Sequence, residues 1–416
     1  MALNYIWIAF FIIAFVIALC KLIFLGDTNS FNVLVDALFA TSKSSVMEIA
    51  LPLAGTMTLW LGFMKIGERA GAISFLSRIV GPFFHRLFPE VPKDHPATGN
   101  MMMNFSANLL GLDNAATPMG LKAMQSLQEL NPNKETASNA QIMFLVLHTS
   151  GLTILPISII AQRAIQGAHD PTDIFIPCII ATYVATIVGI LGVSIKQKIN
   201  LWDKVIISWL LGLTAFIGGV VFYFTYFLTK PQINDVSKIT SNLLVFAIPV
   251  IFMLGAMRKK VNVFEAFIDG AVEGFPTIIK IIPYLVGMLV GIAIFRTSGA
   301  MDYIVSGFKW FFALLHVDTR FCDALPVALI KPLSGSGAKG MMISNMVKPP
   351  LGFGVDSFVG RLGCIFNGSA DTTFYIVALY FGSVGIKNSR YAIPFGLIAD
   401  LAGVIAAIFV GYLFFG

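Results

Sequence analysis

Two polar segments rich in glycine interrupt an otherwise apolar chain, at residues 111–118 and 331–339. Glycine, proline and serine together do not sustain a regular helix, so we expect the backbone to open in both segments. At membrane depth an open backbone has to be buried in protein or line a wet cavity. Its freed N–H groups and the positive end of a half-helix are then available to an anionic group. The residues expected to contact a solute here are Asp113, Asn114, Thr117, Ser334, Gly335, Ser336, Gly337 and Lys339.

A second pair of polar segments, at residues 148–150 and 367–373, places hydroxyls and one ionisable group inside apolar stretches. Asp371 is expected to face a cavity or a cation, because an unpaired carboxylate at mid-membrane costs roughly 2.5–3.5 kcal/mol. The alternative is an internal ion pair, for example with Lys331, that only stabilises the fold. His148 can carry a coupling proton, and a neutral histidine bonded to a hydroxyl explains it equally well. The expected solute contacts are His148, Ser150, Asn367, Ser369, Asp371 and Thr372.

The composition predicts that these segments sit in a helical membrane protein. Of 416 residues, 57% are hydrophobic and 12% are charged, whereas a soluble domain carries about 25% charged residues. Apolar runs near 20 residues recur along the chain, and each is long enough to cross a bilayer as a helix. The formal net charge of +6 comes from basic residues in short loops, which indicates topology signalling and no nucleic-acid partner. The four cysteines are scattered and predict neither a disulfide nor a metal site.

Apolar periodicity predicts a series of helices that ends close to the last residue. Lys196 and Lys198 follow one of them and Arg258 and Lys259 follow another, so the basic loops place the N-terminus in the cytoplasm. The expected helices cover 3–25, 48–66, 72–88, 139–162, 173–195, 204–229, 239–257, 277–296, 302–316, 357–381 and 392–415, with polar-interrupted segments at 96–124 and 323–346.

The chain also contains an internal repeat. Asn32 corresponds to Asn262 and His148 to Asn367, with an offset that falls from 230 to 219 residues. Three expected spans separate the two units, and an odd number inverts the second. We therefore predict an all-α polytopic membrane protein with two inverted-topology repeats and broken or re-entrant helices, in which the site lies at the repeat interface. A duplication kept only for helix packing is the alternative.

Enzyme signatures are weak in this sequence. It has no HExxH zinc motif and no GxSxG elbow, and Ser336 is preceded two residues earlier by Ser334. The aspartates at 113 and 371 are the only candidate catalytic dyad. We expect no enzyme activity, no catalytic residue, no bound metal and no cofactor other than a coupling H⁺ or Na⁺.

These segments resemble spore maturation proteins A and B joined in one chain. The A-like motifs are residues 61–66, 94–97 and 111–118, and the B-like motifs are residues 332–337, 368–375 and 391–394. Both proteins belong to the group called nucleoside-recognition or Gate domain proteins, and related domains occur in the ferrous-iron transporter B channel and, more distantly, in concentrative nucleoside transporters. The resemblance implies a location in the bacterial inner membrane and solute passage.

The resemblance divides the chain into three parts. Residues 1–195 form an A-like half with a first Gate repeat at about 31–165, residues 196–257 connect, and residues 258–416 form a B-like half with a second repeat at about 261–386. The expected function is an inner-membrane transporter or channel for a small polar solute, either anionic or zwitterionic. The expected partners are this solute and membrane lipid, and a homo-oligomer is compatible with the sequence. The alternative function is a non-transporting membrane partner or a lipid-modifying subunit.

Overall fold

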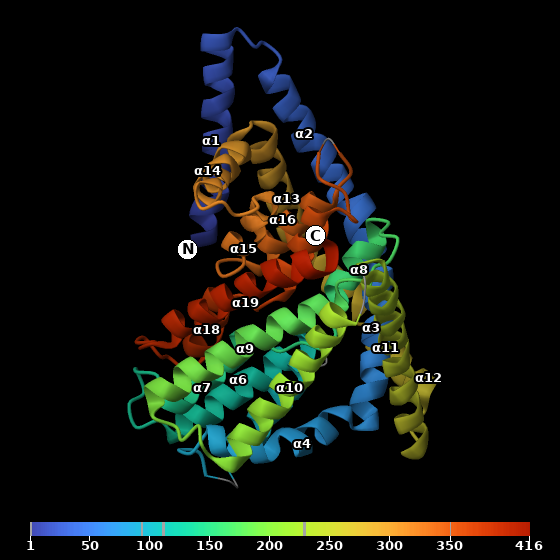
Figure 1. The fold of residues 1–416 in the computed structure, drawn as a ribbon, viewed down its shortest axis with the longest axis vertical. Helices are drawn as coiled ribbons and strands as arrows, with labels where there is room; N and C mark the ends of the chain where they lie inside the picture. Colours follow the sequence, from blue (N-terminus) through green and yellow to red (C-terminus); the bar gives the residue numbers. More distant parts are fainter. Residues whose placement is uncertain (1, 93–94, 110–112, 228–229, 350) are drawn as a thin grey trace. The chain divides into compact units, whose positions relative to one another are not determined.

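The computed structural model describes residues 2–92, 95–109, 113–227, 230–349 and 351–416 (Figure 1). Within these ranges every regular element is a helix, and the one β-type pairing is an isolated bridge between Thr136 and Asn388. The all-α class predicted from apolar periodicity is therefore confirmed.

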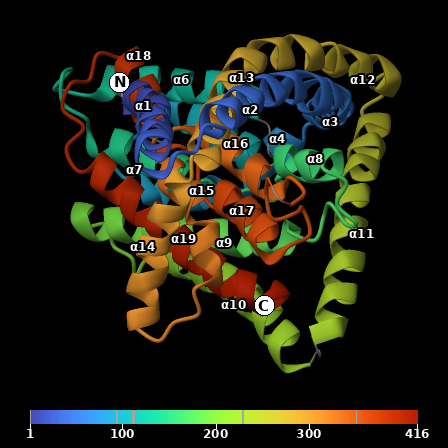
Figure 2. The same ribbon diagram turned by 90° about the horizontal axis from the view of Figure 1, so that it is seen from above.

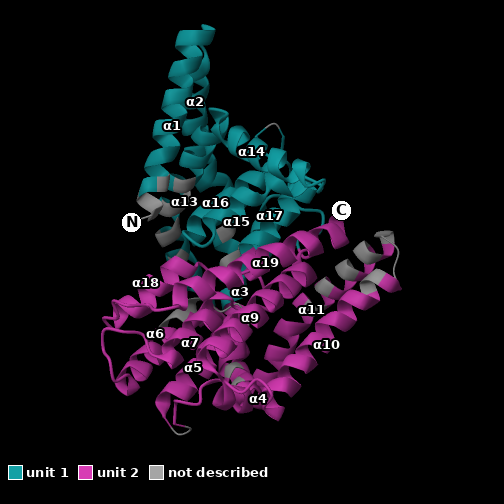
Figure 3. Cartoon of the chain, turned by 60° about the vertical axis from the view of Figure 1, so that its left-hand side comes forward, with its two compact units in different colours: residues 1–61, 158–171, 271–367 teal, residues 62–157, 172–270, 368–416 magenta. Residues whose placement is uncertain are grey.

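The chain divides into two compact units, and each unit draws on segments that are far apart in the sequence (Figure 3). Unit 1 comprises residues 1–61, 158–171 and 271–367, and unit 2 comprises residues 62–157, 172–270 and 368–416. Helix α3 (Leu51–Ala70) begins in unit 1 and ends in unit 2. The division into an A-like half, a connector and a B-like half stays a prediction.

Unit 1 is built around α13 (Gly274–Thr297), which packs against α1, α2 and α16; Figure 2 shows α2 beside α13. Its other helices are α1 (Ala2–Leu25), α2 (Ser30–Ser44), the π-helix Ser45–Ala50, α8 (Ile157–Ile165), α14 (Ala300–Leu314), the 3₁₀ helix Arg320–Asp323, α15 (Leu325–Ile330), α16 (Gly335–Met346) and α17 (Phe358–Gly368).

Unit 2 has the closest helix pairing in the chain, between α9 (Phe175–Gln197) and α19 (Ala392–Phe415). A Cβ atom at Gly403 would lie 3.1 Å from the Ala185 Cβ, so small residues let these two backbones approach. The remaining helices are α4 (Ala72–Leu87), α5 (Pro96–Leu109), α6 (Asp113–Leu130), α7 (Asn139–Thr149), α10 (Lys204–Tyr226), α11 (Lys230–Arg258), α12 (Val263–Ala271) and α18 (Thr373–Ser383).

Several described helices are long and apolar enough to cross a bilayer. Four qualify by themselves: Trp7–Leu25, Phe175–Gln197, Lys204–Tyr223 and Ala392–Phe415. A fifth span is formed if Leu289–Thr297 and Ala300–Leu314 count together, and these are bent by 74° at their junction. Gly299 occupies this junction with φ of 90°, a conformation that glycine adopts without a Cβ penalty. The chain is thus a multi-pass membrane protein with a broken helix pair, while the inverted topology stays a prediction.

Two helices expected to be continuous are interrupted. The prediction of one helix over 139–162 is wrong, because α7 ends at Thr149 and α8 begins only at Ile157. The prediction of one helix over 357–381 is also wrong, because residues 369–372 separate α17 from α18. Both breaks contain hydroxyl residues, which compete for backbone hydrogen bonds. Helix α2, over residues 30–44, had no counterpart among the expected helices.

Candidate functional site

His148 lies in the last turn of α7, in the interior of unit 2. A reciprocal capping box between Ser138 and Gln141 starts this helix, and every residue from Ala140 to Thr149 is buried. The helix is therefore fixed at both ends by packing. The His148 side chain is 3% exposed, so its ring nitrogens depend on protein partners.

The His148 ring meets two asparagines of α5, which are one helical turn apart. Its Nδ1 atom lies 2.8 Å from the Asn108 Nδ2 and 3.0 Å from the Asn104 Oδ1. The first contact offers a donor and the second an acceptor. Nδ1 can therefore accept a hydrogen bond when it is bare and donate one when it is protonated, so both protonation states of the ring have a partner.

Asp371 stands at the edge of this network. Its Oδ2 lies 3.7 Å from the His148 Nε2, and its side chain is 45% exposed. Its backbone N–H donates to the Thr149 carbonyl at 2.7 Å, and the Thr372 N–H donates to the Asp371 Oδ1 at 2.7 Å. The interrupted segment after α7 and the one before α18 are thus joined to each other. A carboxylate exposed in a membrane protein requires water or a counter-charge, so Asp371 opens to an aqueous space.

Tyr380, on α18, closes the other side of the ring. It is fully buried, its hydroxyl lies 3.4 Å from both His148 nitrogens, and its ring stacks on Phe144. The Asn104 Nδ2 also donates to the Ala116 carbonyl at 2.6 Å, which ties the start of α6 to the same network.

The structure brings part of the predicted set together. His148, Ser150, Ser369, Asp371 and Thr372 all belong to unit 2. Ser150, Ser369 and Thr372 are buried, and the Ser150 Oγ donates to the Leu147 carbonyl at 3.3 Å. Of these, His148 and Asp371 are in direct contact.

Two groups of predicted residues do not enter this network as it is described. Asp113, Asn114 and Thr117 lie in the first turns of α6, and their side chains fall outside the described part of the chain, as do Gly111 and Leu112 altogether. The Ser334–Lys339 segment and Asn367 belong to unit 1, where the Ser334 Oγ caps α16 by accepting from the Gly337 N–H at 2.9 Å. Their role in solute contact stays a prediction.

Asn104, Asn108 and Tyr380 were missed by the sequence analysis. The two asparagines recur at i and i+4 on an apolar, methionine-rich segment, and that spacing places both amides on one helix face. This signal was available. Tyr380 gave none, because one tyrosine in an apolar run is ordinary core. Among the described residues, no cluster of three or more His, Cys, Asp or Glu side chains is placed to hold a metal ion.

Gly120, on α6, is the closest neighbour of this network that lacks a side chain. A methyl group there would overlap the Tyr380 hydroxyl and lie 2.9 Å from the Asn104 Nδ2. We expect Gly120→Ala to displace the buried tyrosine and to lower stability by about 1–3 kcal/mol, the usual cost of overpacking. Thermal unfolding of the purified protein in detergent measures this change.

Gly212→Ala on α10 is the matched control, since no atom lies within 4 Å of a Cβ at that position. It is expected to leave stability unchanged or to raise it by about 0.5–1 kcal/mol. Equal unfolding temperatures for Gly120→Ala and Gly212→Ala would show that the Tyr380 packing is not tight.

Comparison with known proteins assigns the chain to a family. The Gate family, described as nucleoside recognition, matches residues 50–166 and 278–387. Spore maturation protein A of Bacillus subtilis (strain 168) is 39% identical over 188 residues, which are 45% of this chain and 92% of that relative. Spore maturation protein B of the same strain is 44% identical over 172 residues, which are 41% of this chain and 93% of that relative. No solved structure matches the chain.

These matches confirm the resemblance proposed from the motifs. The Gate match occurs twice, as a duplicated chain requires, and similarity to both spore maturation proteins is what a fused A/B protein would show. The chain therefore belongs to the Gate family, with two Gate regions in one polypeptide.

Proposed function

We propose that this protein is a transporter or channel for a small polar solute in the bacterial inner membrane, with its N-terminus in the cytoplasm. The observation that carries the proposal is the contact between a buried histidine and a half-exposed carboxylate, His148 and Asp371, at two helix interruptions. A membrane protein that needed only stability would place apolar residues there, because an intramembrane carboxylate is costly.

The pair fits a role in proton-coupled transport. Asp371 is open to bulk while His148 lies behind it, so a proton or a solute ammonium that reaches the carboxylate has the imidazole as its next partner. The two asparagines accommodate either ring state without leaving a buried nitrogen unpaired. Sodium coupling, in which the Asp371 carboxylate would bind the ion, is the second form of the same proposal.

The solute class is proposed from the family description together with this site. Amides, a hydroxyl, an imidazole and a carboxylate suit a solute with several hydrogen-bonding groups, such as a nucleoside, an amino acid, a dipeptide or a dicarboxylate. Nucleosides are the first class to test, because the Gate family is described as nucleoside recognition.

A thermal-stability screen of the purified protein against these four classes tests the proposal, at several pH values and with or without sodium. A ligand that binds only the folded state raises stability by about 2.7 kcal/mol at a hundred times its dissociation constant. We expect a shift with one class. Absence of a shift under every condition would favour the alternative of a non-transporting partner or lipid-modifying subunit.

A further inference from the structure

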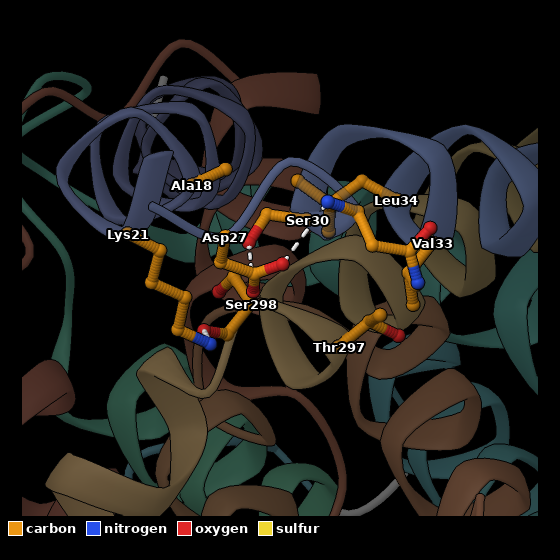
Figure 4. A pocket seen from close by; sticks show the side chains of 9 residues that line it. Ala18, Lys21, Asp27, Ser30, Val33, Leu34, Thr297 and Ser298 are labelled. Atoms are coloured by element: carbon orange, nitrogen blue, oxygen red, sulfur yellow. Dashed lines mark hydrogen bonds between the residues drawn. The ribbon is translucent and has the colours of Figure 1, made fainter. Parts of the chain in front are cut away.

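A polar pocket of about 140 Å³ lies in unit 1, at the turn between α1 and α2 and beside the junction of α13 and α14 (Figure 4). This is the space of about four or five liquid water molecules. Lys21 and Asp27 supply one positive and one negative charge to its lining, and Ser30, Thr297 and Ser298 supply hydroxyls. The pocket belongs to unit 1 alone and is separate from the His148 network of unit 2.

Lys21 reaches into the pocket from the last turns of α1. Its Nζ donates to the Ser298 carbonyl at 3.0 Å, at the end of α13. An ammonium group has three N–H donors, so this bond leaves two for a bound anion. The carbonyl also fixes the position of the charge, which lowers the entropy lost when an anion binds.

Asp27 follows α1 directly and is held in place by its neighbours. Its Oδ2 accepts a hydrogen bond from the Ser30 hydroxyl at 2.6 Å, and its Oδ1 accepts one from the Asn29 N–H at 3.0 Å. These two bonds, the hydroxyl more than the amide, hold the pKa of the Asp27 carboxyl below its usual range. The group is thus ionised at neutral pH, and each oxygen keeps a lone pair for a cationic partner.

The pocket lies at the end of a span. The apolar window of α1 runs from Trp7 to Leu25, only two residues before Asp27. The last three residues of this span, Ile23, Phe24 and Leu25, are 63%, 79% and 76% exposed, as expected of side chains that face lipid. The end of such a span lies at the level of the headgroups.

We propose that this pocket binds the phosphoethanolamine headgroup of a membrane phospholipid, with the phosphate on Lys21 and the ammonium on Asp27. The opposite charges of the pocket match a zwitterion. Phosphatidylglycerol has no cation for Asp27, and the trimethylammonium of phosphatidylcholine has no N–H to donate to it. Soluble phosphoethanolamine shares the chemistry of the headgroup, and the acyl chains distinguish the two sources.

Binding to the purified full-length protein tests the assignment. The probes are phosphatidylethanolamine, phosphatidylcholine, phosphatidylglycerol and soluble phosphoethanolamine, and the readouts are lipid retention in native mass spectrometry and thermal stability. We expect Lys21→Gln and Asp27→Asn each to weaken binding of phosphatidylethanolamine by about tenfold or more, the usual loss of a charged hydrogen bond.

Both substitutions preserve the local structure. Glutamine can still donate to the Ser298 carbonyl, and the amide oxygen of asparagine can still accept from the Asn29 N–H. Lys43→Gln and Asp36→Asn, which remove the same charges from exposed positions on α2, are the matched controls. We expect them to bind phosphatidylethanolamine like the parent protein.

The outcomes separate cleanly. Preference for phosphatidylethanolamine over the other two lipids, lost only in the two pocket variants, supports the proposal. Equal retention of all three lipids, or an equal loss in the control variants, overturns it. Soluble phosphoethanolamine that binds as tightly as the lipid also overturns it, because the pocket would then be a site for free zwitterions.

Discussion

Replacing Asp371 with asparagine is expected to abolish solute binding while leaving the protein folded. The amide keeps an oxygen for the Thr372 N–H, and the backbone bond from residue 371 to Thr149 is unaffected. What is lost is the negative charge beside His148. The loss of one charge-assisted hydrogen bond weakens affinity by roughly 1.5–3 kcal/mol, or about tenfold to a hundredfold. Solute uptake into proteoliposomes and thermal shift with the solute found by screening measure it.

The folded state of this variant needs its own control. Because the Asp371 side chain is 45% exposed, its neutralisation should change stability by no more than about 1 kcal/mol. Glu135→Gln removes a charge from an exposed pair with Lys387 in the same unit and should bind solute normally. Parent-like uptake by the Asp371→Asn variant would remove this carboxylate from the solute path.

Arg163→Met is expected to cause the largest loss of stability of the changes described for this chain. The Arg163 side chain is fully buried in unit 1. Its guanidinium donates to the Val355 carbonyl at 2.9 Å, the Asp170 carbonyl at 3.1 Å and the Asp356 Oδ1 at 3.0 Å. Methionine fills similar space and satisfies none of them. Removal of one member of a buried pair costs about 3–5 kcal/mol, so unfolding in denaturant should shift by that amount.

Lys387→Gln is the comparison for this prediction. The Lys387–Glu135 ion pair is short, at 2.6 Å, but its side chains are 75% and 67% exposed. Solvent screens such pairs, and their loss costs about 0–1 kcal/mol. If the two variants unfold at the same denaturant concentration, the burial of Arg163 in the folded protein is not as described.

The extent to which the site was predictable differs from residue to residue. His148 and Asp371 stand out in the sequence, since each interrupts an apolar run and desolvation makes such residues rare without a role. Their contact does not, because 223 residues separate them and no local period relates one to the other. The continuous helix expected over 139–162 shows the same limit. Its apolar pattern persists through the break, and only the observed hydrogen bonds reveal where the helix ends.

The sequence alone determined the class of this protein: a helical membrane protein with polar interruptions and two related regions. Those properties depend on composition and on local backbone preferences, which each segment carries by itself. The tertiary structure decided which of the polar residues meet. Asn104, Asn108 and Tyr380 become partners of His148 only because α5, α7 and α18 pack together, and Arg163 is buried only because it lies beside residues 355 and 356. Packing of helices distant in sequence depends on the whole set of side-chain shapes, and a single segment contains no record of it.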